Sequence, residues 1–182
     1  MHLVTIQNKK VLNILKSGKI YKADFAYICD DIEKDYSYKI STYQVLMKHY
    51  MYITPPIFCA VLNRFAIFDG TKYNKDSIIL KIDVPDDLIK MHLNITWKII
   101  LRSFEEDTWT SAIYNGIEAY LDGRNADLKD MCVQAVIPYI KPEWLIEAYK
   151  VPKNFMDLFS SKSPVKEVLK NEHFNKDILF SK

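Results

Sequence analysis

The side chains that most often carry enzyme chemistry are spread through this chain without an informative spacing. Its cysteines, Cys29, Cys59 and Cys132, form no Cys-x-x-Cys pair, and its four histidines form no His-x-x-x-His or mixed Cys/His cluster of the kind that holds zinc. Each cysteine lies among apolar neighbours, which is typical of a buried thiol that acts as a small core residue. The sequence therefore predicts no metal site.

Glycine and acidic residues give no better signal for catalysis. The four glycines lie too far apart to form a Gly-x-Gly-x-x-Gly motif or a phosphate-binding loop. Asp30-Asp31 and Asp86-Asp87 are adjacent in sequence, and adjacent residues do not share a helix face, so each pair favours solvation or capping over a catalytic dyad. We therefore predict a protein that is not an enzyme, with no catalytic residue and no cofactor.

Charged and aromatic side chains are better candidates, as contacts to a partner. Aromatic residues make up 13% of the chain, more than a small core requires, and exposed Tyr, Trp and Phe are favoured interface anchors. The alternative is that the acidic runs are solvated surface and the tyrosines cover the rim of the core. The residues that we predict to contact a partner are Asp30, Asp31, Glu33, Asp35, Tyr36, Tyr38, Tyr73, Glu105, Glu106, Asp107, Lys162, Lys166 and Lys170.

The charge is unevenly distributed along the chain. The net charge is +2, but residues 150–182 hold seven lysines and four acids, which gives this tail +3. Lys162, Lys166 and Lys170 have the spacing of four that places side chains along one helix face. A chain with so small a net charge is neither an acidic mimic of nucleic acid nor a general nucleic-acid binder, so we expect at most a weak nucleic-acid contact through the tail.

Hydrophobic patterning predicts the elements of the first half. Residues 3–7 read as a strand, followed by a helix that Asn8 caps and that ends at Gly18. A second helix over 41–53 stops at two prolines. Residues 57–62 and 77–84 are apolar and rich in β-branched side chains, which is typical of buried strands.

The second half mixes helices with one further strand. We predict a short helix over 87–92 capped by Asp86, a segment at 96–104 that is either helix or strand, a helix over 110–123 and a core strand over 131–140. Pro142 then begins a helix that buries Trp144, Leu145, Ala148 and Tyr149. After Ser163-Pro164 a last helix buries Val165, Val168 and Leu169. These elements predict an α+β fold with a mixed, mainly antiparallel central sheet flanked by helices. Residues 1–159 form one domain, and 160–182 form a basic helical appendage.

The opening strand and helix resemble the first motif of the ADP-ribosyltransferase-like fold. That motif has an apolar strand ending in His-x-Thr, and the late strand of the same fold carries a catalytic Glu. Here Val4 stands in place of the His, and Gln134 in "VQAVIP" stands in place of the Glu. Neither side chain can perform the role of the residue that it replaces. The resemblance implies a nucleotide pocket that has lost its chemistry, with Thr5, Gln7 and Gln134 in its lining.

Four ordered motifs give a wider resemblance. The segments "LVTIQ…ILKSG", "YQVLMKHYM", "LKIDVPDD" and "VQAVIPYIKPEWL" are similar to an uncharacterised bacterial and phage domain family that includes an anti-CRISPR inhibitor of type II RNA-guided nucleases. The match spans roughly residues 2–150 and leaves the basic tail outside. It implies a non-catalytic protein that binds the guide-loaded nuclease with its guide RNA and blocks DNA cleavage.

Two other functions compete with this reading. One is an ADP-ribosyltransferase-like enzyme, or a derivative that still binds NAD. The other is a nucleic-acid-binding regulator that uses the lysine stripe of the tail. No apolar run approaches the ~18 residues that span a bilayer, and the first residues lack the pattern of a signal peptide. We therefore expect a cytoplasmic protein of a bacterial cell with no membrane contact.

Overall fold

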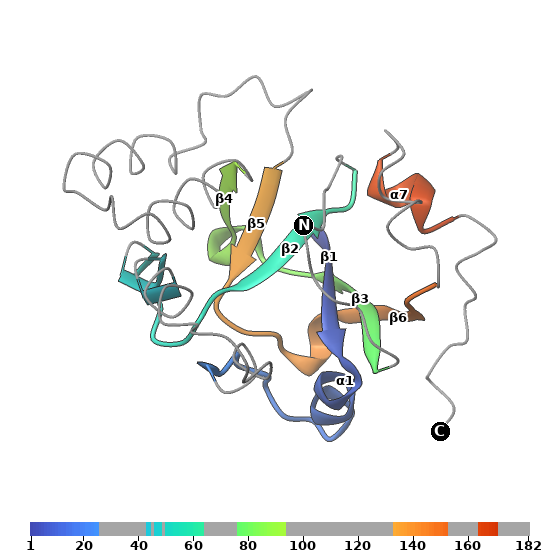
Figure 1. The fold of residues 1–182 in the computed structure, drawn as a ribbon, viewed down its shortest axis with the longest axis horizontal. Coiled ribbons are helices and arrows are strands. Elements are labelled where there is room, and N and C mark those ends of the chain that lie inside the picture. Colours follow the sequence, from blue (N-terminus) through green and yellow to red (C-terminus); the bar gives the residue numbers. More distant parts are fainter. Residues whose placement is uncertain are drawn as a thin grey trace, which may run out of the picture.

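The structure is a computed structural model, and it describes residues 1–25, 43–44, 46–48, 50–63, 76–93, 133–152 and 164–170. A six-stranded sheet in the order β4-β5-β2-β1-β3-β6 organises these residues (Figure 1). All five strand pairings in it are antiparallel. The strands are β1 (His2–Asn8), β2 (Ile57–Val61), β3 (Ser77–Asp83), β4 (Lys90–Leu93), β5 (Val133–Ile137) and β6 (Leu145–Lys150).

The first strand and helix form as the local sequence predicts. β1 leads directly into α1 (Lys9–Lys16), and the Asn8 side chain accepts a hydrogen bond from the Lys10 backbone N–H at 2.9 Å. This capping bond satisfies one of the donors that the first helical turn leaves open. Gly18 ends the helix with a left-handed φ of +77°, a conformation that costs glycine little because it has no Cβ.

A second helix end uses the same geometry without a glycine. Residues 43, 44, 46–48 and 50 are helical, as predicted. The chain then turns at Met51, which has a φ of +57°, and the Tyr52 N–H donates to the Met47 carbonyl at 2.8 Å. The equivalent bond after α1 runs from Lys19 to Ile14 at 3.3 Å. Both helices therefore end in a Schellman motif.

Residues 142–150 differ from the prediction. The expected helix is wrong after its first turn, since a 3₁₀ turn (Pro142–Trp144) leads into β6, which pairs with β3. A bulge shifts the register between Lys81 and Ile82, so that one extra residue separates the β6 partners of these two residues. The bulge places Leu145 and Ala148 on the same face of the sheet, three residues apart. That spacing is also typical of a helix, which explains the wrong prediction.

The region after the third strand also differs. The expected helix over 87–92 is wrong, because Asp86–Leu88 form a single 3₁₀ turn and β4 follows it. Asp86 lies inside this turn rather than capping it, and Pro85 occupies the N-cap position without a side-chain hydrogen bond. Four paired residues of β5 hold β4 in the sheet. Pairing of the backbone with a neighbouring strand therefore outweighs the local signal for a helix.

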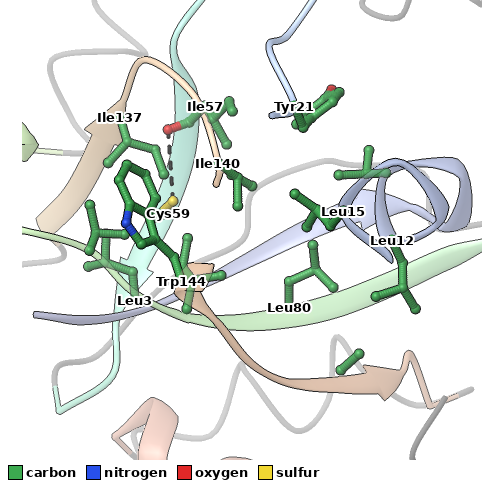
Figure 2. Packing of buried hydrophobic residues seen from close by; sticks show 14 of the residues in the cluster. Leu3, Leu12, Leu15, Tyr21, Ile57, Cys59, Leu80, Ile137, Ile140 and Trp144 are labelled. Atoms are coloured by element: carbon green, nitrogen blue, oxygen red, sulfur yellow. Dashed lines mark hydrogen bonds between the residues drawn. The ribbon is translucent and has the colours of Figure 1, made fainter. Parts of the chain in front are cut away.

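Each face of the sheet carries its own buried cluster. On the first face, which we call the α1 face, Leu12 and Leu15 of α1 pack with Leu3, Leu80 and other strand residues. Figure 2 shows Trp144 and the buried thiol of Cys59 in the same cluster. Cys59 is thus the core residue that the sequence predicts. The predictions for Cys29 and Cys132 lie outside the described residues.

The opposite face, which we call the α7 face, is covered differently. Its buried residues are Val4, Ala60, Leu62, Ile79 and Tyr149 of the sheet region, together with Val165, Val168 and Leu169. The last three come from the short helix α7 (Val165–Val168) and the residue after it. The Lys166 backbone N–H also donates to the Leu62 carbonyl at 2.7 Å. One turn of the predicted helix after Pro164 is therefore present, and it packs against the sheet (Figure 1).

The fold is thus α+β and dominated by an antiparallel sheet. The helix predicted over 110–123 and the ambiguous segment 96–104 lie outside the described residues. Within the ranges that the structure describes, no helix is long and apolar enough to cross a membrane.

Candidate functional site

A cleft of about 400 Å³ opens on the α7 face, beside the helix. Its lining comes from five parts of the chain: β1, the turn after β2, β3, β6 and the segment 166–170. The described residues that line it are His2, Leu62, Asn63, Lys81, Glu147, Tyr149, Lys166, Leu169 and Lys170. We call this hollow the α7 cleft.

The floor of the α7 cleft is a polar patch next to the apolar cluster of the α7 face. Lys81 and Glu147 are direct partners across β3 and β6, and the Lys81 ammonium lies 3.4 Å from the Glu147 carboxylate. Strand alternation places Ile79 two residues from Lys81 on the same face, where it pairs with Tyr149. The patch therefore begins where the apolar contact with α7 ends.

Tyr149 belongs both to the floor of the α7 cleft and to the buried cluster of the α7 face. Its ring is buried against α7, and its hydroxyl donates a hydrogen bond to the Glu147 carboxylate. Burial raises the pKa of Tyr149 well above its ordinary value, and the hydrogen bond to Glu147 and the negative charge of that residue raise it further. Tyr149 is therefore a neutral hydrogen-bond donor at physiological pH. Its phenolate is not available as a base or a nucleophile.

The rim of the α7 cleft is cationic. Lys166 and Lys170 are exposed, and neither makes an ion pair or a side-chain hydrogen bond with the described part of the chain. With Lys81 they supply three positive charges to the lining, against one negative charge from Glu147. His2 also lines the cleft, with its Nε2 at 3.8 Å from an Asp83 carboxylate oxygen. The excess of cations predicts attraction for an anionic ligand.

Leu62 and Leu169 give the α7 cleft an apolar side, and the exposed amide of Asn63 lies next to it. Most of the lining is polar or charged, so the cleft suits a small charged ligand better than an apolar one. The chemistry of this lining suits binding. The Glu147 carboxylate forms a salt bridge with Lys81 and accepts a hydrogen bond from the Tyr149 hydroxyl. The raised pKa of Tyr149 keeps that hydroxyl protonated.

Of the residues predicted to contact a partner, the structure brings Lys166 and Lys170 together at the cleft, four positions apart as expected. The other predicted contacts lie outside the described residues: Asp30, Asp31, Glu33, Asp35, Tyr36, Tyr38, Tyr73, Glu105, Glu106, Asp107 and Lys162.

The residues of the alternative nucleotide pocket have other surroundings. Thr5 is fully buried, its hydroxyl donates to the Phe58 carbonyl at 2.8 Å, and it accepts from the Gln7 amide at 2.9 Å. Gln134 lies on β5, which β2 separates from β1. The hydroxyl of Thr5 therefore links β1 to β2 and has no exposed surface for a ligand.

Sequence reasoning missed His2, Lys81, Glu147 and Tyr149. The signal for the last two was present in their spacing, since residues two apart share a strand face. It was hidden because Leu145 and Ala148 made the segment look helical. The partnership of Lys81 with Glu147 joins residues 66 positions apart, and no local pattern reports it.

The chain was compared with models of protein families, with curated proteins and with solved structures, and none of them matches it. Among the described residues, no group of three or more His, Cys, Asp or Glu side chains is arranged to hold a metal ion.

Proposed function

We propose that this chain is a non-catalytic binding protein, and that it inhibits a guide-loaded type II CRISPR nuclease by contacts that block DNA cleavage. The resemblance of its four ordered motifs to the phage and bacterial family supports this function. The observation that carries the proposal is the α7 cleft, where Lys166 and Lys170 lie beside Lys81 with a local excess of positive charge.

An RNA-guided nuclease offers such a surface a suitable target. Its guide RNA and target strand expose a row of phosphates, and its own channel is basic. The lysines of the cleft suit the phosphates, whereas the acidic runs at 30–35 and 105–107 suit the basic channel. A protein that contacts both can hold the complex in a form that does not cleave. We also propose that it acts in the bacterial cytoplasm, with 160–182 as a basic helical appendage to a body formed by 1–159.

The lining of the cleft favours binding over acid–base chemistry. A general base must release and take up a proton near neutral pH. The Glu147 carboxylate pairs with an ammonium, and the raised pKa of Tyr149 keeps its phenol protonated. Both groups are therefore suited to fixing the position of a ligand.

The test is a pull-down against a type II nuclease with and without guide RNA, followed by DNA cleavage on the same samples. We expect guide-dependent binding and loss of cleavage with the unaltered chain. The double variant Lys166→Ala/Lys170→Ala should weaken binding by about tenfold, because it removes two charges from the contact. Lys19→Ala/Lys90→Ala removes two exposed lysines outside the cleft and is the matched control.

Unchanged cleavage at molar excess of the protein, together with no binding to the guide-loaded nuclease, would refute the proposed function. The ADP-ribosyltransferase-like alternative would then be tested by turnover of labelled NAD and by the shift in melting temperature on adding NAD. Mutation of Thr5 provides no test of that alternative, because its hydroxyl also holds β1 to β2.

A further inference from the structure

We infer that the α7 cleft takes one unpaired nucleotide of a nucleic-acid strand, with its phosphate beside Lys166 and Lys170 and its sugar and base towards Leu62 and Leu169. The inference rests on the proposed function in one respect only: the guide-loaded nuclease is the source of such a nucleotide. The size of the cleft, its charge and the arrangement of its walls support the assignment independently of that source.

The size of the cleft limits the ligand to a small group. A volume of about 400 Å³ is at the lower end of the range that ligand pockets occupy, roughly 300–1,000 Å³. A duplex presents a convex surface many times wider and cannot enter. A single nucleotide that has left the stack, or one at the end of a strand, is of the right size. Proteins that recognise single strands commonly hold such unstacked nucleotides in pockets.

The charges in the cleft determine where the phosphate end of such a ligand lies. The lysines attract a phosphate, whereas the Glu147 carboxylate repels it, so the phosphate lies on the side of Lys166 and Lys170. The salt bridge from Glu147 to Lys81 and the hydrogen bond from Tyr149 hold this carboxylate in place. The electrostatic field therefore orients the nucleotide as well as attracting it.

The remaining lining suits the uncharged part of a nucleotide. Leu62 precedes the exposed amide of Asn63, and Leu169 precedes the exposed Lys170. Each apolar wall residue thus stands beside a polar one. This arrangement lets a base contact the small apolar surface that Leu62 and Leu169 leave exposed while its edge reaches a polar group. A simple phosphate or a carboxylate would make no use of this surface.

The position of the rim lysines is fixed by packing. Val165, Val168 and Leu169 are buried against the sheet, and the Lys166 amide is bonded to the Leu62 carbonyl. Consequently the cleft exists before the ligand arrives, and little ordering of the chain is needed on binding. Preorganisation of this kind favours affinity for a small ligand.

The inference is tested by fluorescence anisotropy with the full chain and four probes. The probes are a labelled single-stranded RNA with a 5′-phosphate, the same sequence as single-stranded DNA, the RNA in duplex form, and unlabelled uridine monophosphate as a competitor. We expect binding of the single strands, no more than a tenth of that affinity for the duplex, and displacement by the mononucleotide. Neutralising one phosphate predicts a slope of roughly −0.7 for log K against log salt.

Variants identify the site. Lys166→Ala/Lys170→Ala should lower the affinity for single strands by about tenfold and reduce the salt slope by half or more, whereas Lys19→Ala/Lys90→Ala should leave both near those of the unaltered chain. Lys166→Arg/Lys170→Arg retains the charge and should retain binding. Tighter binding of RNA than of DNA assigns the ligand to the guide, and the reverse order assigns it to displaced DNA.

Several results would overturn the inference: equal affinity for duplex and single strand, no competition by uridine monophosphate, or equal loss in the cleft variant and the control. A protein that inhibits the nuclease but binds no single strand retains the proposed function and loses this inference. A protein that binds single strands through the cleft without inhibiting cleavage retains the inference and loses the proposed function.

Discussion

Truncating Val165 to alanine removes two methyl groups from the contact between α7 and the sheet. The Val165 side chain is fully buried among Val4, Leu62 and other residues of the α7 face. Each buried methyl or methylene group contributes about 0.8 kcal/mol, so the variant should lose about 1.6 kcal/mol of the free energy that holds α7 in place. That amount corresponds to roughly a 15-fold change in an equilibrium constant, since about 1.4 kcal/mol is tenfold.

Amide hydrogen exchange reports this equilibrium at one bond. The Lys166 N–H donates to the Leu62 carbonyl at 2.7 Å and exchanges only when α7 leaves the sheet or the whole protein unfolds. Its protection factor should therefore fall by about 15-fold in Val165→Ala. If α7 opens by itself, the amides of β1 and β3 retain their protection. If it opens only with global unfolding, their protection falls with that of Lys166.

The control is Lys166→Ala, which truncates an exposed neighbour and leaves the buried contact intact. Its effect on the exchange of this amide should be less than about threefold, because surface substitutions usually change stability by no more than about 0.5 kcal/mol. An unchanged protection factor in Val165→Ala would refute the reasoning. It would mean that this side chain does not hold α7, and that the rim of the α7 cleft is not fixed by packing.

Three further predictions concern the backbone, a buried hydroxyl and a buried thiol. Met51→Gly should stabilise the protein by about 1 kcal/mol, because Met51 is 88% exposed and has a left-handed φ of +57°. Gly18→Ala should destabilise it by a similar amount, because it places a Cβ at a left-handed φ of +77°. A destabilising Met51→Gly or a stabilising Gly18→Ala in urea unfolding would contradict this explanation. Thr5→Val should cost about 1 kcal/mol, because it removes the part-buried hydrogen bond from the Thr5 hydroxyl to the Phe58 carbonyl, and an unchanged urea midpoint would count against that bond. Burial raises the pKa of the Cys59 thiol from 9.0 to about 12, and the neighbouring Thr5 side chain opposes this rise by a smaller amount. Since the unfolded thiol ionises first, stability should fall as the pH rises above 9 towards 12. In a variant whose other cysteines are serine, the slope of unfolding free energy against pH in this window should flatten on Cys59→Ala, and an identical slope would show that the thiol does not titrate as described.

The first strand, the first helix and β3 could be predicted because their signals are local. Asn8 and Gly18 mark the two ends of α1 by side-chain and backbone chemistry that needs no distant partner. The run of β-branched residues at 77–84 matches β3 (Ser77–Asp83), and Val165, Val168 and Leu169 were expected on one face of a helix.

Residues 87–93 and 145–150 could not be assigned from their own sequence, because their structure depends on neighbouring strands. A β-bulge opposite Lys81 and Ile82 places Leu145 and Ala148 on one face, and this periodicity is the same as that of a helix. β4 is a strand because β5 supplies the hydrogen-bonding partners of its backbone. The local sequence of either segment does not indicate which strand it pairs with.

The spacing of Lys166 and Lys170 was determined by the sequence itself. Only the tertiary structure decided what lies beside them. Lys81 lies on β3, and Glu147 and Tyr149 lie on β6, 66 or more positions further along the chain. The pairing of β3 with β6 brings them to the floor of one cleft. Patterns in a sequence reflect short-range periodicity, whereas a binding site depends on which faces of distant elements pack together.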